Sequence, residues 1–499
     1  MALKSNIIAN FLGQGWSALM ALAFIPIYIR YLGMDAYGLI GVFALLQAWL
    51  AVLDAGLTPT LSREMARYSA GGLSNEELHE LALSVERIFI IVAVAIAVIA
   101  MVAAPWLSRA WLRPEELDTA TVTQALVIAG WVIAFRWMAG LYKGAINGLQ
   151  QQVWLNVCSS AFATARGLGA VGVLIWVSPT IQAFFVYQGI VTAVEAMVLA
   201  IQMRRFLPPV PRAVRFSMAP LRRVWRFAGG MTAITVLATL LAHVDKLMLS
   251  NLLTLSDFGY YMLASAVAAA VHALIGPIFT ATYPRLVELV AQGSESTVAA
   301  AYHYFAQLLS VVVLPPAMVM AMLPEHLLVL WTGDASLAIT VAPLLSLLVI
   351  GSMLNGVMHI PYALQLAHGW TQFAVRMNII SVALLVPAIY IGVSHYGAIA
   401  AAMAWMILNV GYVTVGMPFM HRRLLKSELH RWYLKDVGGP LVASFTVAGL
   451  ARVLAPAPSV NARGESLLMM VIIVGAALLA ALVTTELGRQ TLQRTVRRC

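Results

Sequence analysis

The chain has 499 residues, of which 61% are hydrophobic and only 10% are charged, and its mean hydropathy is +0.86. This composition excludes a soluble globular protein and predicts a membrane protein. The 31 lysines and arginines exceed the 21 aspartates and glutamates, which gives a formal net charge of +10. We expect membrane lipids as partners of these cations, and no nucleic acid.

Long apolar runs follow one another along the whole chain. A bilayer needs about 20 apolar residues per helix, and only helices and closed barrels satisfy their backbone groups in lipid. The first run, from Ile7 to Ile29, is too long for a signal peptide and is expected to be retained. The tenth, from Leu337 to Leu366, could form one broken helix. We predict roughly fourteen spans, which start near Ile7, Tyr37, Ile88, Val122, Val153, Ile181, Phe227, Tyr260, Tyr302, Leu337, Phe373, Ala398, Val437 and Leu467.

Basic segments orient these spans and divide the chain. With a cytoplasmic N-terminus, most cations fall on the inner side, so the positive-inside rule predicts that both termini are cytoplasmic. We predict an N-terminal lobe over 1–203, a basic cytoplasmic linker over 204–226, a C-terminal lobe over 227–420, a basic loop over 421–436, and two further spans and a tail over 437–499. Cys158 lies inside an apolar run and Cys499 is the last residue, so no structural disulfide is expected.

Polar residues recur at helical spacing within several apolar runs. Residues at i, i+3, i+4 and i+7 share one helix face. Span four carries such a stripe in Arg136, Gly140, Lys143 and Asn147, and span seven carries one in Thr232, Thr235, Thr239, His243 and Lys246. Such stripes either line a cavity or serve helix packing, since small and polar residues do both in membranes.

Charges inside the spans are the strongest candidates for function, because each costs several kcal/mol at the bilayer centre. Arg166 and Glu195 lie near the midplane, where they form either a structural ion pair or part of a cavity. Asp245 and Lys246 lie near the outer interface and either pair or snorkel. We predict cavity cations at Arg166, Arg136 and Lys246, and cavity polar or ion-coupling groups at Asp54, Glu195, His243, Asp245, His272, Thr235 and Thr239.

Several function classes lack a signature here. The chain has no GxxxxGK[ST] sequence, no HExxH, and no cluster of cysteine or histidine at metal spacing. No cofactor or metal is therefore expected, and transport would use an ion gradient or the gradient of the substrate.

The opening of the chain resembles one known family. The stretch "FIPIYIRYLGMDAYGLIGVFALLQAWLAVLDAGLTPTLSREMARY" is similar to the start of polysaccharide or O-antigen flippases of the multidrug/oligosaccharidyl-lipid/polysaccharide exporter superfamily. In both, a Leu-Gly-x-x-x-Tyr-Gly turn leads into span two. Asp245 and Lys246 late in span seven, followed by Gly259 and Tyr260, match the second half of the family.

This resemblance implies an all-α membrane protein with two six-helix lobes in a V around a central cavity, plus two C-terminal helices. It implies translocation of an undecaprenyl-diphosphate-linked oligosaccharide across the bacterial cytoplasmic (inner) membrane, by alternating access, for surface polysaccharide biosynthesis. Polymerase and chain-length proteins of the same pathway are candidate partners. The family motif carries over only Lys246 among the predicted cations, and the other two come from depth and spacing.

Two other functions stay open at this point. A multidrug exporter of the same superfamily usually binds cations and would favour an acidic cavity, whereas the spans here hold three cations, Arg136, Arg166 and Lys246, beside Asp54, Glu195 and Asp245. A polymerase or ligase of lipid-linked glycans tends to carry a large outer loop, which this sequence does not show. We therefore expect a transporter rather than an enzyme.

Overall fold

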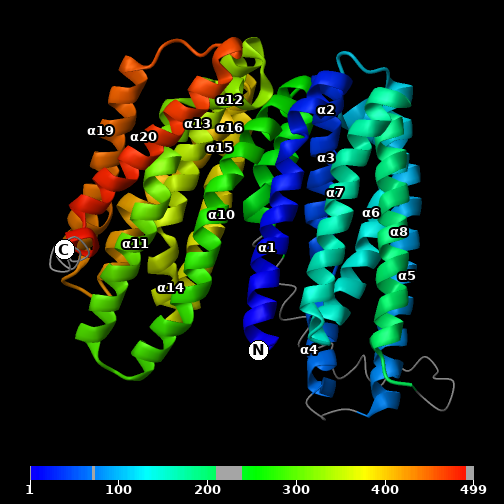
Figure 1. The fold of residues 1–499 in the computed structure, drawn as a ribbon, viewed down its shortest axis with the longest axis horizontal. Helices are drawn as coiled ribbons and strands as arrows, with labels where there is room; N and C mark the ends of the chain where they lie inside the picture. The colour runs from blue at the N-terminus through cyan, green and yellow to red at the C-terminus, as the bar shows by residue number, and fades with distance from the viewer. Residues whose placement is uncertain (1, 55, 70–73, 210–235, 237–238, 490–499) are drawn as a thin grey trace. The chain divides into compact units, whose positions relative to one another are not determined.

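The computed structural model describes residues 2–54, 56–69, 74–209, 236 and 239–489, which are almost entirely helical (Figure 1). No strand occurs among these residues. In this part of the chain, 12 helices are long and apolar enough to cross a membrane. The protein is an all-α, multi-pass membrane protein, as its composition predicts.

The first of two compact units comprises Met1–Gly259. In it α6 lies at the centre and contacts α4, α5 and α8, and Figure 1 shows α5, α6 and α8 side by side. Its helices are α1 (Ala2–Ala23), α2 (Ile25–Leu32), α3 (Met34–Leu53), α4 (Leu57–Ser69), α5 (Asn75–Trp106), the π-helical η1 (Leu107–Trp111), α6 (Thr119–Gly148), α7 (Gln152–Trp176), α8 (Ile181–Phe206) and a run over 239–252.

The second unit comprises Tyr260–Cys499, and α10 begins shortly before it. Here α11 contacts α13, α19 and α20. The elements are α10 (Leu255–Ala291), α11 (Glu295–Met322), α12 (Pro324–Thr332), α13 (Ala335–Val357), α14 (His359–Ala367), α15 (Thr371–Tyr396), α16 (Ala398–Gly411), π-helical η2 (Tyr412–Gly416), α17 (Met417–His421), α18 (Leu429–Arg431), π-helical η3 (Trp432–Gly438), α19 (Gly439–Leu454), the 3-10 turn η4 (Val460–Ala462) and α20 (Arg463–Thr484).

Local sequence explains where several helices of the first unit begin and end. Pro26 sits in the first turn of α2, where its missing N–H is not needed, so α1 and α2 separate at Phe24. Gly33 has a φ of 83°, a left-handed value that suits glycine, and divides α2 from α3. Ser74 and Glu77 form a capping box that starts α5.

The predicted spans agree with the helices except in detail. The second span is α3, whose apolar part Met34–Leu50 is shorter than the others. The tenth is broken, because α13 ends at Val357 and α14 starts at His359. The start of the seventh span and most of the basic linker lie outside the described residues, so the predicted lobe boundaries stay a prediction.

The helices α4 and α6 pack closely against each other in the first unit. Gly148, at the end of α6, lies against the backbone of α4: a Cβ there would overlap the carbonyl oxygen of Ser62 and lie 2.8 Å from Cβ of Met65. Small residues permit such approach between membrane helices. Only a residue without a side chain fits at this position.

We expect Gly148→Ala to destabilise the protein by about 1–3 kcal/mol, because the overlap is with backbone atoms that cannot rotate away. Thermal unfolding of the purified chain in detergent measures this. The matched control is Gly140→Ala on the same helix, where a Cβ meets nothing within 4 Å. Equal melting temperatures for the two variants would show that the α4–α6 contact is not tight.

Candidate functional site

A buried carboxylate on α8 gathers cations from two neighbouring helices. Glu195 is only 2% exposed. The Nζ atom of Lys143, on α6, lies 2.7 Å from its Oε1, and a guanidinium N–H of Arg166, on α7, donates to its Oε2. The Arg166–Glu195 pair, one of the two alternatives that the sequence leaves open, is thus present, and Lys143 joins it.

Glycines beside Arg166 let α7 approach its neighbours closely. A Cβ on Gly167 would overlap the ring of Phe24, and a Cβ on Gly169 would overlap the hydroxyl of Tyr187. That hydroxyl donates to the carbonyl oxygen of Ala165 over 2.8 Å. Through these contacts with Phe24 and with Tyr187 on α8, the stretch "TARGLGAVG" places Arg166 opposite Glu195.

A third cation lies on the same α6 stripe as Lys143. An Nη1–H of Arg136 donates to Oε1 of Gln47 over 2.7 Å, and its guanidinium lies over the ring of Phe43 at 5.1 Å. Arg136 is also within electrostatic range of Arg166 and Glu195. We call Arg136, Lys143 and Arg166 with Glu195 the cation cluster, and in it the cations exceed the carboxylate by two charges.

Arg136 opens onto a cavity of about 470 Å³, here called the arginine cavity. Asp54 also lines it, but its carboxylate is engaged: it accepts from the backbone N–H of Thr58 over 3.1 Å and from the hydroxyl over 2.6 Å, and so caps α4. The full lining is Gln47, Leu50, Asp54, Thr58, Pro59, Phe89, Arg136, Trp137 and Gly140. The space is therefore mostly apolar, with a few polar groups and one cation.

A second cavity, of about 530 Å³, shares Thr58 and Pro59 with the first and so adjoins it. We call it the amide cavity, because amides dominate its polar lining. It is lined by Thr58, Pro59, Ser62, Arg63, Ala66, Gly144, Asn147, Gly148, Gln150 and Gln152. The α6 stripe runs beside both cavities, as its helical spacing predicts.

The predicted residues of span seven lie apart from these cavity linings. Lys246 Nζ lies 3.1 Å from Oδ2 of its neighbour Asp245. These two residues therefore form an ion pair, which is one of the two alternatives that the sequence leaves open. Thr239 and His243 are half-buried on the same helical run, and His272 is exposed on α10. Thr235 lies outside the described residues.

Sequence reasoning left out several residues that line the site. Lys143 and Asn147 belong to the recognised α6 stripe, and Gln47 lies seven residues before Asp54 in span two, so helical spacing could have found all three. Arg63 lies in the middle of α4, outside the recognised stripes, and Gln152 is the first residue of α7, where spacing within one span gives no signal. Among the described residues, no group of three or more histidines, cysteines or carboxylates could hold a metal ion.

Comparison with known proteins agrees with this architecture. The chain is 20% identical over 421 residues to the "Putative O-antigen transporter" of Shigella flexneri, covering 82% of this chain and 95% of that protein. The fold is similar to that of the lipid II flippase MurJ in an inward closed conformation, with a TM-score of 0.71 at 12% identity, covering 95% of this chain and 97% of that one.

The fold is also similar to an inward-facing multidrug resistance transporter of the MATE family in the MOP superfamily. That likeness has a TM-score of 0.67 at 14% identity and covers 83% of this chain and 96% of the other. Residues 3–290, more than half of the chain, match the family described as "Polysaccharide biosynthesis protein". By this match, and in agreement with the motifs of its first two spans, the chain belongs to the polysaccharide biosynthesis protein family.

Proposed function

We propose that this protein is a flippase that translocates an undecaprenyl-diphosphate-linked oligosaccharide across the bacterial cytoplasmic membrane, by alternating access, for surface polysaccharide biosynthesis. Family membership and the O-antigen transporter relative support a polysaccharide pathway. The likeness to a lipid II flippase supports a fold able to carry a lipid-linked substrate.

The cation cluster is the observation that carries this proposal. A diphosphate needs cations and N–H donors in place of its water shell, and arginine supplies planar, two-pronged donors for phosphate oxygens. Arg136, Lys143 and Arg166 offer such donors with two charges in excess over Glu195. Without substrate, Lys143 and Arg166 donate to Glu195. When substrate binds, these two side chains donate to the diphosphate instead.

The two adjoining cavities suit the rest of the substrate. Hydroxyl-rich sugars need hydrogen-bonding groups, which the amide cavity supplies through Asn147, Gln150 and Gln152. The prenyl chain needs no protein cavity, since lipid solvates it. Lys246, restrained by Asp245, guides the anionic head at the outer mouth, in the orientation with both termini cytoplasmic.

A multidrug exporter is the second candidate, since the MATE transporters share the fold. Such an exporter usually binds cationic drugs, which the excess positive charge of the cation cluster repels. The paired state of Asp54 and Glu195 adds to this argument, because these two carboxylates beside the cation cluster and the arginine cavity already have donors. The charge of the site therefore favours an anionic substrate.

A deletion strain tests the function. We expect it to accumulate lipid-linked oligosaccharide in the inner leaflet and to lose its surface polymer, and a plasmid copy of the gene should restore both. Glycan analysis of extracted lipid carriers, with a leaflet-specific probe, measures the first, and electrophoresis of surface polysaccharide measures the second. Unchanged surface polymer together with new sensitivity to cationic drugs would assign the exporter function instead.

A further inference from the structure

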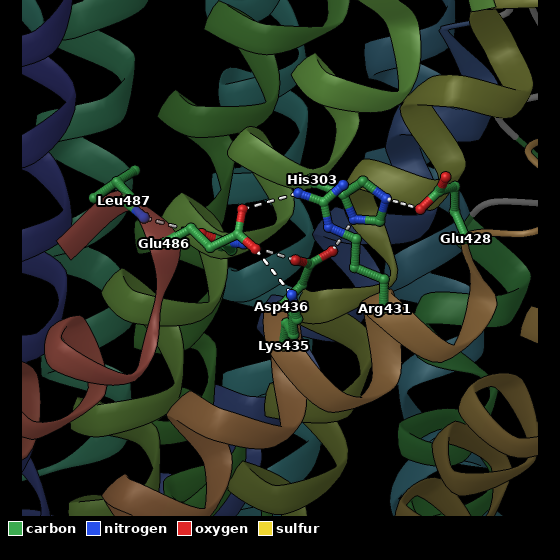
Figure 2. Close-up of polar contacts among 8 residues, drawn as sticks. His303, Glu428, Arg431, Lys435, Asp436, Glu486 and Leu487 are labelled. Atoms are coloured by element: carbon green, nitrogen blue, oxygen red, sulfur yellow. Dashed lines mark hydrogen bonds and ion pairs between the residues drawn. The ribbon is translucent and has the colours of Figure 1, made fainter. Parts of the chain in front are cut away.

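A second buried polar cluster lies on α11 in the other unit, away from the cation cluster in the sequence (Figure 2). Its central residue is His303, about 12 Å along α11 from the first residue of the helix. His303 is 1% exposed and Asp436, in η3, is 0% exposed. Glu428, in the loop before α18, is 26% exposed at its side chain. Neither the proposed transport function nor the family resemblance assigns a role to these three residues.

Both ring nitrogens of His303 face carboxylate oxygens. Nδ1 is hydrogen-bonded to Oδ2 of Asp436, and Nε2 lies 3.0 Å from Oε2 of Glu428. Figure 2 shows the ring between the two carboxylates, which come from opposite sides of it. The histidine thus bridges two acidic side chains from the loop and the π-helical segment that lead into α19.

This geometry fixes the number of protons in the trio. A neutral imidazole has one N–H donor and one acceptor nitrogen, and an ionised carboxylate only accepts. Two hydrogen bonds between three such groups need two protons, and a neutral His303 supplies one. An imidazolium, with one N–H on each ring nitrogen, donates to both carboxylates and so satisfies both contacts.

Nearby basic residues do not compensate the two carboxylates. Arg431 and Lys435 pair instead with Glu486, at 2.9 Å and 3.2 Å. The hydrogen bond from Lys435 and the charge of Arg431 lower the pKa of Glu486, so that carboxylate is ionised and occupies both cations. Within the described residues, no ion pair within 4.0 Å joins a lysine or arginine to Asp436 or Glu428. His303 is the group in direct contact with both carboxylates that can supply a positive charge.

The remaining neighbours of the ring supply no opposite charge. His421, on α17, packs on Tyr302 beside His303, and its Nδ1 is hydrogen-bonded to the carbonyl oxygen of Met417 over 3.2 Å. Gln307, one turn along α11, donates to Oδ1 of Asp436 over 2.9 Å and accepts from the backbone N–H of Leu487 over 3.2 Å. The network thus connects α11 to the start of α19 and to the residues just after α20.

We propose that His303 is a proton-binding site, held as an imidazolium between Asp436 and Glu428, and that this bound proton ties the last two spans to α11. The proton comes from water at Glu428, which lies outside the predicted spans. Without it, the fully buried Asp436 and the partly exposed Glu428 face a neutral ring, and a buried carboxylate without a cation costs far more than a solvated one. This inference does not depend on which substrate the protein carries.

A spectroscopic experiment tests the proton directly. The full-length protein, labelled with nitrogen-15 histidine and reconstituted in lipid, should give a His303 signal with both ring nitrogens protonated. Comparison with His303→Gln, which lacks that signal, assigns it. A His303 spectrum with one unprotonated ring nitrogen would overturn the proposal.

A stability experiment tests what the proton does. We expect His303→Gln to lower the melting temperature of the purified full chain by about 5 °C or more, because it leaves two carboxylates without a cation. Adding Glu428→Gln should recover much of that loss, since it removes one of the two negative charges. The matched control is His326→Gln: this buried histidine of the same unit is hydrogen-bonded through Nε2 to the carbonyl oxygen of Pro456 over 2.9 Å.

Two results would contradict the proposed role. If His303→Gln and His326→Gln lower the melting temperature equally, His303 serves only as a packed side chain. If Glu428→Gln makes the His303→Gln protein less stable still, the carboxylate is not repelled in the variant and the charge argument is wrong. Should His303→Gln not fold at all, recovery of folded protein by the added Glu428→Gln substitution supports the proposal, and failure of that recovery opposes it.

Discussion

Replacing Arg166 with alanine is expected to lower export of the lipid-linked oligosaccharide by about tenfold or more. A hydrogen bond to a charged group contributes about 1.5–3 kcal/mol, and 1.4 kcal/mol corresponds to a factor of about ten. The fold should persist, because Lys143 still pairs with Glu195 and leaves no buried carboxylate without a cation. Surface polymer per amount of membrane-inserted protein, in a complemented deletion strain, measures the effect.

Two further variants make this result specific. Arg285 pairs with Glu288 at 2.6 Å, and both side chains are about half exposed. Because an exposed ion pair contributes little, Arg285→Ala should leave export unchanged. Arg166→Lys keeps the charge but loses the planar fork, so we expect an intermediate rate. Full export by Arg166→Ala and by Arg166→Ala with Glu195→Ala would show that the pair neither binds substrate nor supports the structure.

Replacing Glu195 with glutamine is expected to destabilise the protein by about 2–4 kcal/mol, since it leaves Lys143 and Arg166 without their shared carboxylate. This is less than the about 3–5 kcal/mol for a fully buried pair, because the Lys143 side chain is 36% exposed and keeps part of its solvation. The melting temperature of the purified chain in detergent measures it.

The control for this substitution is Glu288→Gln, which breaks an exposed ion pair and should change stability by less than about 1 kcal/mol. A double variant, Glu195→Gln with Arg166→Ala, should be more stable than the sum of the two single effects predicts, since the residues interact directly. Additive effects in this cycle would show that Arg166 and Glu195 do not depend on each other.

The sequence predicts those features that depend on hydrophobic run length, helical spacing and turn residues within single spans. Hydrophobic length gives the class of protein and most of its spans, because a bilayer of fixed thickness demands runs of similar length. Helical spacing gives the α6 stripe of Arg136, Lys143 and Asn147, because the period of a helix does not depend on its neighbours. The turn residues of the first two spans give the family, which the match over residues 3–290 confirms.

Contacts between residues of different helices cannot be predicted from these patterns within single spans. The sequence places Arg166 and Glu195 at similar depth, but depth alone does not show whether they meet, nor that Lys143 shares the carboxylate. Asp54 reads as an intramembrane charge, and the structure shows that it caps α4 through Thr58, an assignment that depends on the exact residue where α3 ends.

The sequence by itself determined that this protein lies in a membrane, the succession of its spans, its family and the helix face that Arg136 and Lys143 share. Only the tertiary structure decided which charges meet: Glu195 with Lys143 and Arg166, and His303 with Asp436, 133 residues further along the chain. The physical reason is that apolar length and helical period act within one helix. Ion pairs between helices depend instead on the rotation and height at which two helices pack, and glycines such as Gly148 and Gly167 set that packing through contacts far away in the sequence.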